Sequence, residues 1–373
     1  MELASRLAQH SRVEVCMESA GKYWIPVFNI LEKTCLVTLA HPKYTKPQKG
    51  NKTDRKDAKW ICDLFMCGMI KPNFIPPADI RQLRDLVRYR GKLTNCLTGE
   101  KNRAQNCLIV SNRKLDDVFS DVFGKSARSI TEYLHNHPGE AFDVTPFIDR
   151  RCKHPAGEIQ AAVDGAVSPE QAVKLRECLN HINELETHRA NIESEILTLT
   201  DRYSLVLNLL RTVPGFSANL MTAISTIAEI GADMSVFPTT KQLCSWAGCC
   251  PRNDQSGGKV KSTRISRAGA YIKPLLVQVA NAVIRSKEHP EFRERYLRIK
   301  ARRGHKKAII VICRMLLTAI WNILTKLAPY SPDGFLSLRP ADQSKSLTSS
   351  QALALLRLRR SCILDDPPVP SPA

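Results

Sequence analysis

A Ser-Gly-Gly-Lys motif at residues 256–259 is the feature of this chain with the clearest chemical potential. No acidic residue occurs in the surrounding residues 255–287, so a phosphate drawn to this segment would meet only cations. A hydroxyl that attacks a phosphodiester needs such surroundings, because cations offset the charge of the reacting phosphate. We therefore predict that Ser256 is a nucleophile; the alternative is a surface turn with solvated charge. A nucleotide-hydrolase phosphate loop is excluded, because Lys259 is followed by Val260 instead of Ser or Thr.

Cations near the serine are the expected phosphate contacts. Four of them are predicted to bind DNA or RNA: Lys259, Lys261, Arg264 and Arg267. The whole chain has a net charge of +19 and a pI of about 9.5, which indicates a polyanionic partner, nucleic acid before membrane. Basic residues cluster at residues 43–59 and again at residues 287–307, where nine Lys or Arg stand against three Glu. The second cluster contains Arg302 and Arg303, which we also expect to contact nucleic acid.

Three carboxylates in the N-terminal part could form an acidic site. Glu18 ends a predicted strand, whereas Asp54 and Asp57 lie three residues apart at a predicted helix start and so face the same way. Taken alone, the two aspartates suit a solvated helix N-terminus, where they complement the macrodipole. Together with Glu18 they could bind Mg²⁺, which prefers oxygen ligands and commonly combines few carboxylates with phosphate oxygens. Two such ions can stabilise both the attacking and the leaving oxygen of a phosphoryl displacement.

Cysteine usage indicates a reducing compartment. The chain has 13 cysteines, an odd number, at irregular spacing and without a C-x-x-C pair. We therefore interpret them as reduced thiols of a cytoplasmic protein. We also predict no membrane contact, on the expectation that no apolar run approaches the roughly 20 residues that a span requires.

The N-terminal segment predicts an α/β unit. Residues 13–18 and 35–39 have the composition of short strands, and residues 24–33 between them are expected to be helical. This order is typical of a parallel strand pair. Thr53 can N-cap the next helix, which is expected to run to about Cys67.

Two long helices are predicted in the middle of the chain. The first covers residues 80–108, and the second begins at Ser168 with Pro169 in its first turn. The second helix has seam positions that alternate by three and four: Leu175, Cys178, Ile182, Leu185, Arg189, Ile192, Ile196 and Leu199. This alternation favours a coiled-coil arm, formed with the first helix or with another subunit. Ordinary packing inside one domain is the alternative, and residues 138–166 carry no firm prediction.

The C-terminal half is predicted to be mostly helical. Residues 209–216 lead into a helix at residues 218–230 and look like a helix-hairpin-helix element, although a plain turn is the alternative. The turn at Gly215 would leave backbone N–H groups available to a DNA phosphate. Helices at residues 271–284 and 308–327 are expected to cover the serine loop. The predicted domains are residues 1–79, 80–200 and 201–330, followed by a disordered tail at residues 331–373.

Three motifs together resemble the DEDD transposases of bacterial insertion sequences, the group related to the pilin-gene invertase and guided by a bridge RNA. The first is Cys-Met-Glu-Ser-Ala-Gly-Lys-Tyr-Trp at residues 16–24, and the second is Lys-Thr-Asp-Arg-Lys-Asp-Ala at residues 52–58. The third runs from Ala247 through Pro251 to the Ser-Gly-Gly-Lys motif. The motifs follow the order of the family, and the resemblance covers about residues 1–330.

The resemblance implies both a fold and a chemistry. The N-terminal domain would be a resolvase-like ribonuclease-H fold, with Glu18, Asp54 and Asp57 as the second, third and fourth members of its acidic tetrad. Ser256 would match the serine that forms a covalent link to DNA. The family acts as an oligomer, here expected to be a dimer or tetramer, in which the acidic site of one subunit completes the serine site of another. A structured guide RNA would pair with donor and target DNA.

One departure from the family concerns the first acidic residue, which sits on an opening strand of the family's fold. This chain has no Asp before Asp54. We therefore expect an N-terminally truncated copy with a partial ribonuclease-H-like domain, in which sheet edges are left unpaired and catalysis can be lost.

The sequence thus predicts a DNA transposase, or recombinase, that cuts and rejoins double-stranded DNA through a serine–DNA intermediate and a Mg²⁺-dependent acidic site. Two alternatives stay open. One is a catalytically inactive nucleic-acid-binding remnant, which would form no covalent adduct. The other is a metal-dependent junction nuclease in which Ser256 is structural, so that cleavage would survive Ser256→Ala but not Asp54→Ala.

Overall fold

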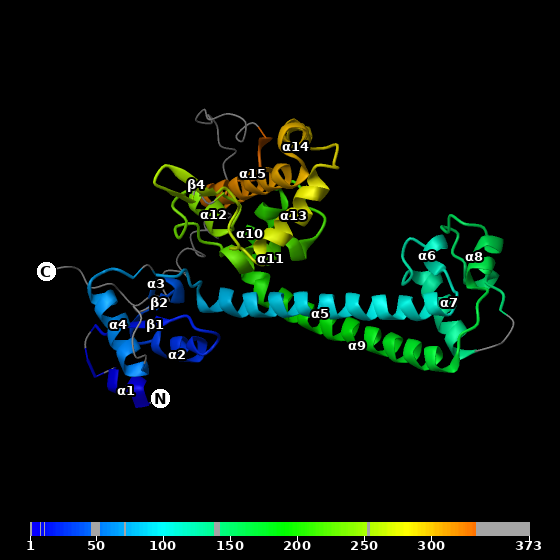
Figure 1. The fold of residues 1–373 in the computed structure, drawn as a ribbon, viewed down its shortest axis with the longest axis horizontal. Coiled ribbons are helices and arrows are strands. Elements are labelled where there is room, and N and C mark those ends of the chain that lie inside the picture. Colours follow the sequence, from blue (N-terminus) through cyan, green and yellow to red (C-terminus); the bar gives the residue numbers. More distant parts are fainter. Residues whose placement is uncertain are drawn as a thin grey trace. The chain divides into compact units, whose positions relative to one another are not determined.

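The computed structural model describes residues 2–7, 9–10, 12–45, 53–70, 72–137, 142–251 and 254–332. Most of these residues are helical, and the strands form two short pairs in this part of the chain (Figure 1). The architecture agrees with the predicted combination of an α/β unit and helices, and it is compatible with a ribonuclease-H-like domain. The predicted disordered tail, apart from its first two residues, lies outside the described residues, and the predicted domain boundaries stay predictions.

The N-terminal part contains the predicted strand–helix–strand unit. β1 (Glu14–Glu18) and β2 (Leu36–Ala40) pair in parallel, from Glu14 opposite Leu36 to Glu18 opposite Ala40. A parallel pair requires a crossover connection, which α2 (Trp24–Leu31) supplies while burying Phe28 and Leu31. The prediction of a parallel pair is therefore confirmed. The unit also includes α1 (Glu2–Leu7), α3 (Pro42–Thr45) and α4 (Asp54–Met66).

The two long helices are α5 (Ala78–Val110) and α9 (Pro169–Thr200), and they pack against each other (Figure 1). Arg90 pairs with Glu193 at 2.6 Å and Lys101 pairs with Glu186 at 3.6 Å. Residue numbers rise along α5 as they fall along α9, so the helices are antiparallel. Their supercoiling stays a prediction.

The buried positions of α9 differ by one residue from part of the predicted seam. Leu175, Ile182, Leu185 and Ile196 are buried as expected, but the structure buries Leu179 and Thr200 where Cys178 and Leu199 were predicted. An α-helix has 3.6 residues per turn and drifts against a seam of period 3.5. The buried residues of α9 therefore form a stripe that is wider than a strict three-four seam.

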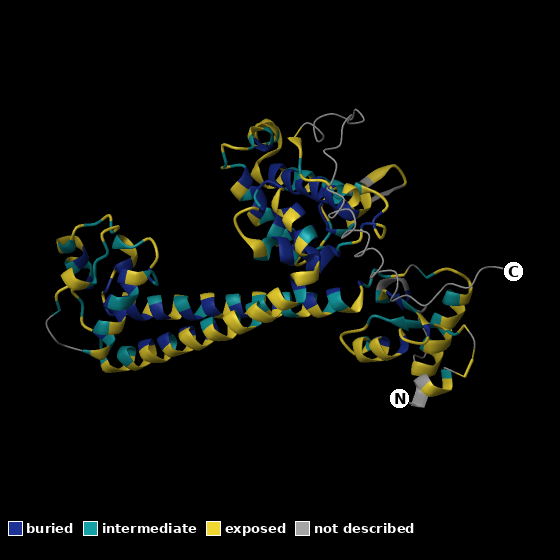
Figure 2. Cartoon of the chain, turned by 180° about the vertical axis from the view of Figure 1, so that it is seen from behind, coloured by how far each residue is buried: buried dark blue, intermediate teal, exposed yellow. Residues whose placement is uncertain are grey.

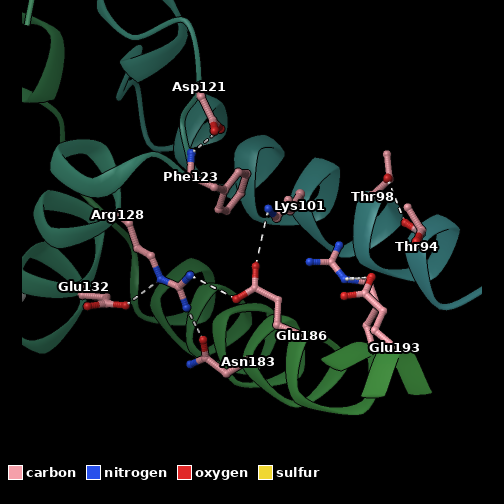
Figure 3. Close-up of polar contacts among 11 residues, drawn as sticks. Thr94, Thr98, Lys101, Asp121, Phe123, Arg128, Glu132, Asn183, Glu186 and Glu193 are labelled. Carbon is pink, nitrogen blue, oxygen red and sulfur yellow. Dashed lines mark hydrogen bonds and ion pairs between the residues drawn. The ribbon is translucent and has the colours of Figure 1, made fainter. Parts of the chain in front are cut away.

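Four short elements lie between the long helices, in a region for which no firm prediction was made. They are α6 (Leu115–Val118), α7 (Lys125–Asn136), η1 (Thr145–Phe147) and α8 (Ala156–Val163). Arg128 of α7 donates to Glu132 at 3.1 Å, to Glu186 at 3.3 Å and to Asn183 (Figure 3). Because Asn183 and Glu186 belong to α9, this guanidinium fastens α7 to the long helix.

The C-terminal elements are helices and one hairpin: η2 (Asp201–Tyr203), α10 (Ser204–Arg211), α11 (Leu220–Ile230), α12 (Thr240–Trp246), β3 (Asp254–Ser256), β4 (Lys259–Ser262), α13 (Ile272–Val283), α14 (Pro290–Arg303) and α15 (His305–Lys326). α15 contacts α10, α12, α13 and α14 and supplies much of the buried apolar surface, drawn dark blue in Figure 2. Trp321 on α15 also donates to the carbonyl of Phe237 at 2.7 Å. The helix-hairpin-helix assignment of α10 and α11 stays a prediction.

α15 corrects one expectation from the sequence. Its 22 residues are long and apolar enough to cross a membrane by length and composition, although no apolar run of that kind was expected. In the structure, 56% of its apolar window is buried, and its inward residues include Ile312, Leu316 and Ile320. It is therefore packed as a core helix.

Candidate functional site

Ser256 is the last residue of a strand in a tight hairpin. β3 and β4 pair antiparallel, and Ser256 lies opposite Lys259. The two residues between them, Gly257 and Gly258, have φ values of +56° and +75°. Two positive φ values are typical of a type I′ turn, whose twist matches that of a hairpin. A Cβ at either glycine would meet open space, so backbone conformation alone requires them.

The base of this hairpin is held by a close crossing of two backbone turns. Pro251 and Ile265 form an antiparallel bridge. A Cβ on Gly248 would lie 2.3 Å from the carbonyl oxygen of Ala268, and one on Gly269 would lie 2.1 Å from that of Ala247. The crossing thus requires glycine on both sides.

Lys273 on α13 also supports the base of the hairpin. Its Nζ donates to the carbonyl of Ser266 at 2.7 Å and lies close to Gly248. In the sequence, Lys273 is simply one cation of the segment without acidic residues; the structure gives its ammonium group a backbone partner. Nothing local in the sequence distinguishes it from its basic neighbours.

Buried thiols adjoin the base of the hairpin but are poor nucleophiles. Burial raises the pKa of Cys244 to about 11 and the pKa of Cys249 and of Cys313 to about 12. Only a thiolate is a strong nucleophile, so these groups are inert near neutral pH.

Three of the four predicted phosphate contacts around the hairpin are exposed. Lys259, Arg264 and Arg267 are all on the surface, and none has an ion pair with another described residue. Lys261 is on β4, but its side chain lies outside what the structure describes. The same holds for the side chain of Ser256, so its placement here rests on the backbone.

Gly215 occupies the turn between α10 and α11 for a packing reason. Its φ is +82°, and a Cβ there would lie 2.5 Å from Val283 and 2.8 Å from Val279, both on α13. The turn therefore needs glycine to approach α13, whereas its predicted contact with DNA stays a prediction. Arg302 and Arg303 are exposed in the last turn of α14.

The predicted acidic residues lie on β1 and α4. Glu18 ends β1 and accepts a hydrogen bond from the buried Thr45 hydroxyl at 2.8 Å. The Thr45 carbonyl in turn accepts from Trp60 Nε1 on α4 at 3.1 Å. Thr45 and Trp60 were not predicted from the sequence, because no local pattern links residues 27 and 15 positions apart.

α4 begins as predicted, with its two aspartates in the first turn. Thr53 is the N-cap and accepts from the backbone N–H of Lys56 at 3.3 Å. Asp54 and Asp57 follow within that turn, where acidic side chains suit the macrodipole.

A complete metal site does not form from the described residues. No group of three His, Cys, Asp or Glu side chains among them could hold a metal ion. Glu18, Asp54 and Asp57 therefore do not fit a three-ligand centre as they stand. The three carboxylates lie at the end of β1 and the start of α4, whereas Ser256 lies at the end of β3.

Comparison with known families gives two matches. Residues 1–110 match a model described as a transposase of the DEDD, IS110 type, and residues 207–297 match one described as the transposase IS116/IS110/IS902 family. The first match includes Glu18, Asp54 and Asp57, and the second includes Gly215 and Ser256.

Individual relatives agree with these matches. A probable family 20 transposase of Pseudomonas aeruginosa is 25% identical over 324 residues, which cover 85% of this chain and 86% of the relative. A transposase for insertion sequence element IS1111A of Coxiella burnetii is 24% identical over 326 residues, or 85% of this chain and 79% of the relative. A pilin gene-inverting protein of Moraxella lacunata is 27% identical over 138 residues, or 36% and 42%.

Proposed function

The chain belongs to the IS110 family of transposases, which cut and rejoin DNA, and we propose that it does so through a covalent ester between a DNA phosphate and Ser256. One observation carries this proposal. The glycine turn places Ser256 at the tip of a hairpin, opposite Lys259, in a segment without acidic residues from 255 to 287.

The proposed step is a displacement at phosphorus. A bond forms between the serine oxygen and phosphorus while one P–O bond of the DNA backbone breaks. The serine proton leaves to solvent, and the displaced strand takes up a proton to end in a hydroxyl. Attack of a strand hydroxyl on the ester then restores the phosphodiester and releases the serine, so the bond energy is conserved for rejoining.

Cations around the hairpin would hold the DNA during this step. Lys259, Arg264 and Arg267 are exposed and lack described ionic partners, so they are available to phosphate oxygens. Lys261 on β4, Gly215 in its turn, and Arg302 and Arg303 on α14 complete the proposed nucleic-acid contacts. The proposed substrates are the donor and target duplexes.

The acidic residues are proposed to be needed for cutting. Transposases of the DEDD type typically use a divalent metal, and Mg²⁺ is the proposed ion, with Glu18, Asp54 and Asp57 as candidate ligands. The described residues contain no three-ligand group of their own. We propose instead that a homo-oligomer brings the carboxylates of one subunit to the serine hairpin of another, and that a structured guide RNA pairs with both duplexes.

The test of the serine is a protein–DNA adduct that survives denaturation. The full chain would be incubated with Mg²⁺, its flanking non-coding RNA and labelled donor and target DNA. We expect an adduct that Ser256→Ala abolishes and that Ser262→Ala, the same change in the paired strand, preserves. Cutting that survives Ser256→Ala but not Asp54→Ala would point to a junction nuclease, and binding without any adduct would point to an inactive protein.

Sharing of the site between subunits has a separate test. Ser256→Ala and Asp57→Asn would each be inactive alone. If one subunit completes the site of another, mixing the two variants restores part of the adduct. Two inactive variants that stay inactive when mixed, although they co-assemble, would refute sharing.

A further inference from the structure

Six exposed cations gather where α14 ends and α15 begins, and we call them the basic corner: Arg295, Arg298, Arg302, Arg303, Lys306 and Lys307. The first three follow i, i+3, i+7 spacing and so share one face of α14, over about 10 Å of helix. No acidic residue occurs from residue 295 to residue 332. Glu291 and Glu294 lie one turn before Arg295 and Arg298 on α14, but no acidic residue follows them in the corner, which is therefore strongly positive.

None of the six forms an ion pair or hydrogen bond with another described residue. Arg128 and Arg90 show the contrast, since each is paired with a glutamate. The backbone beneath the corner is nonetheless well supported. Tyr296 Oη lies 2.8 Å from His305 Nδ1 across the junction of the two helices, and Phe292 is fully buried. A supported backbone with unpaired cations suits an external anionic partner.

Helix stability explains only part of this charge. Arg302 and Arg303 lie in the last turn of α14, where cations complement the macrodipole. Lys306 and Lys307 lie in the first turn of α15, which contains no acidic residue and where cations oppose the macrodipole. These two lysines therefore cost stability where they stand, so binding is the better reason for them.

We propose that the basic corner binds the phosphate backbone of duplex DNA, as a surface separate from the serine hairpin; this rests on the proposed function. Figure 1 shows α14 and β4 on different sides of the helices that pack around α15. The corner exposes no Phe, Tyr or Trp ring among the described residues, since Tyr296 is 7% exposed and Phe292 is buried. The imidazole of His305 is exposed, but its Nδ1 lies 2.8 Å from Tyr296 Oη. Single-stranded nucleic acid and RNA loops are usually held by stacking on such rings, whereas a duplex backbone needs only charge.

The test measures binding without cutting. In a Ser256→Ala background, anisotropy of a labelled 30-base-pair duplex of arbitrary sequence would be followed across salt concentrations. A triple variant, Arg298→Gln, Arg302→Gln and Lys306→Gln, is expected to weaken binding at least about tenfold near 0.15 M salt. It should also reduce the slope of log affinity against log salt by about 3, roughly one per lost phosphate contact.

The matched control removes three exposed cations elsewhere, through Arg150→Gln, Arg151→Gln and Lys153→Gln in the loop before α8. It should leave affinity within about twofold and the slope nearly unchanged. Equal losses in both triple variants would overturn the proposal, because they would reflect net charge alone. Retained duplex binding with loss of binding to the flanking RNA would also overturn it.

A stability measurement separates binding from a structural role. Lys306→Gln alone should weaken duplex binding while leaving the unfolding midpoint unchanged or slightly higher, because it removes a cation from the start of α15. A fall in the midpoint that accompanies the loss of binding would overturn the proposal. Failure of the serine mechanism would be seen in a different experiment. An adduct that still forms in Ser256→Ala would contradict the role of the serine, but it would not change the duplex affinities measured here.

Discussion

Arg88 on α5 holds both carboxylate oxygens of Glu229 on α11, with Nε 2.8 Å from Oε1 and Nη2 2.9 Å from Oε2. The Glu229 side chain is only 6% exposed. The same guanidinium lies 4.0 Å from the centre of the Tyr271 ring. Arg84, one turn earlier, donates to the carbonyls of Ala228 and Glu229, each at 2.8 Å. Together these contacts fasten the beginning of α5 to the end of α11.

Removing Arg88 should destabilise the protein strongly. Arg88→Met leaves the buried Glu229 carboxylate without its ionic partner, which typically costs about 3–5 kcal/mol of the free energy of unfolding. The double variant with Glu229→Met should lose less than the sum of the two single variants, because no lone charge remains. Urea unfolding of the parent, the two single variants and the double variant measures these losses. Additive losses, or a loss below about 1 kcal/mol in Arg88→Met, would mean that the pair is not coupled.

The conformation at Gly257 should control the serine hairpin. Gly257→Val places a β-branched residue at a positive φ, which costs about 1–2 kcal/mol or more, and should lower the yield of serine adduct. Gly257→Asn is the matched control, since asparagine followed by glycine is favoured in type I′ turns. Both side chains have room, so equal loss of activity in both variants would argue that the turn conformation is not what matters.

The crossing of Gly248 and Gly269 should be intolerant of any side chain. Gly269→Ala combines a φ of +70° with a Cβ 2.1 Å from a backbone oxygen, so we expect a loss of at least about 2 kcal/mol. Gly91→Ala is the control, because that glycine is inside α5 with no atom near its Cβ. This control should gain about 0.5–1 kcal/mol. Thermal unfolding of the two variants should therefore move in opposite directions.

Stability should fall at alkaline pH because of the buried thiols. The folded state keeps the protons of Cys249 and Cys313 until pH is about 12, whereas the unfolded chain releases them near the ordinary thiol pKa of 9.0. The protonated thiols therefore contribute their full share to the free energy of unfolding below about pH 9, and this share is lost as pH rises toward 12. Unfolding midpoints between pH 8 and 11 should fall less steeply in Cys313→Ala than in the parent, although that variant starts from lower stability. Equal slopes of unfolding midpoint against pH in the parent and in Cys313→Ala would contradict a role of this thiol.

The same burial predicts an order of thiol reactivity. Cys62, Cys67 and Cys96 are exposed, whereas Cys244, Cys249 and Cys313 are buried. Alkylation of the folded protein at pH 8, followed by mass spectrometry, should label the exposed group first. Early labelling of Cys249 would show that the region beneath the hairpin opens readily.

Local patterns were sufficient for the parts of the fold that depend on nearby residues. The strand–helix–strand unit follows from hydrophobic composition, and Thr53 caps α4 as its type suggests. Both long helices were predicted from periodicity, to within two residues at each predicted end of α5. The two adjacent glycines after Ser256 form a tight turn, and a surface turn was the alternative interpretation of this motif. In each case the relevant interactions lie within a few residues along the chain.

Contacts between distant residues decided the rest. Thr45 reaches Glu18 across 27 positions, Arg128 reaches Glu186 across 58, and Arg88 reaches Glu229 across 141. Burial by neighbouring helices also makes α15 a core helix, although its own composition would suit a membrane. The sequence by itself determined the chemistry on offer: a serine in a cationic segment, three carboxylates and excess positive charge. Only the tertiary structure decided which cations are tied to partners and which stay exposed, because that depends on packing between segments that no local pattern encodes.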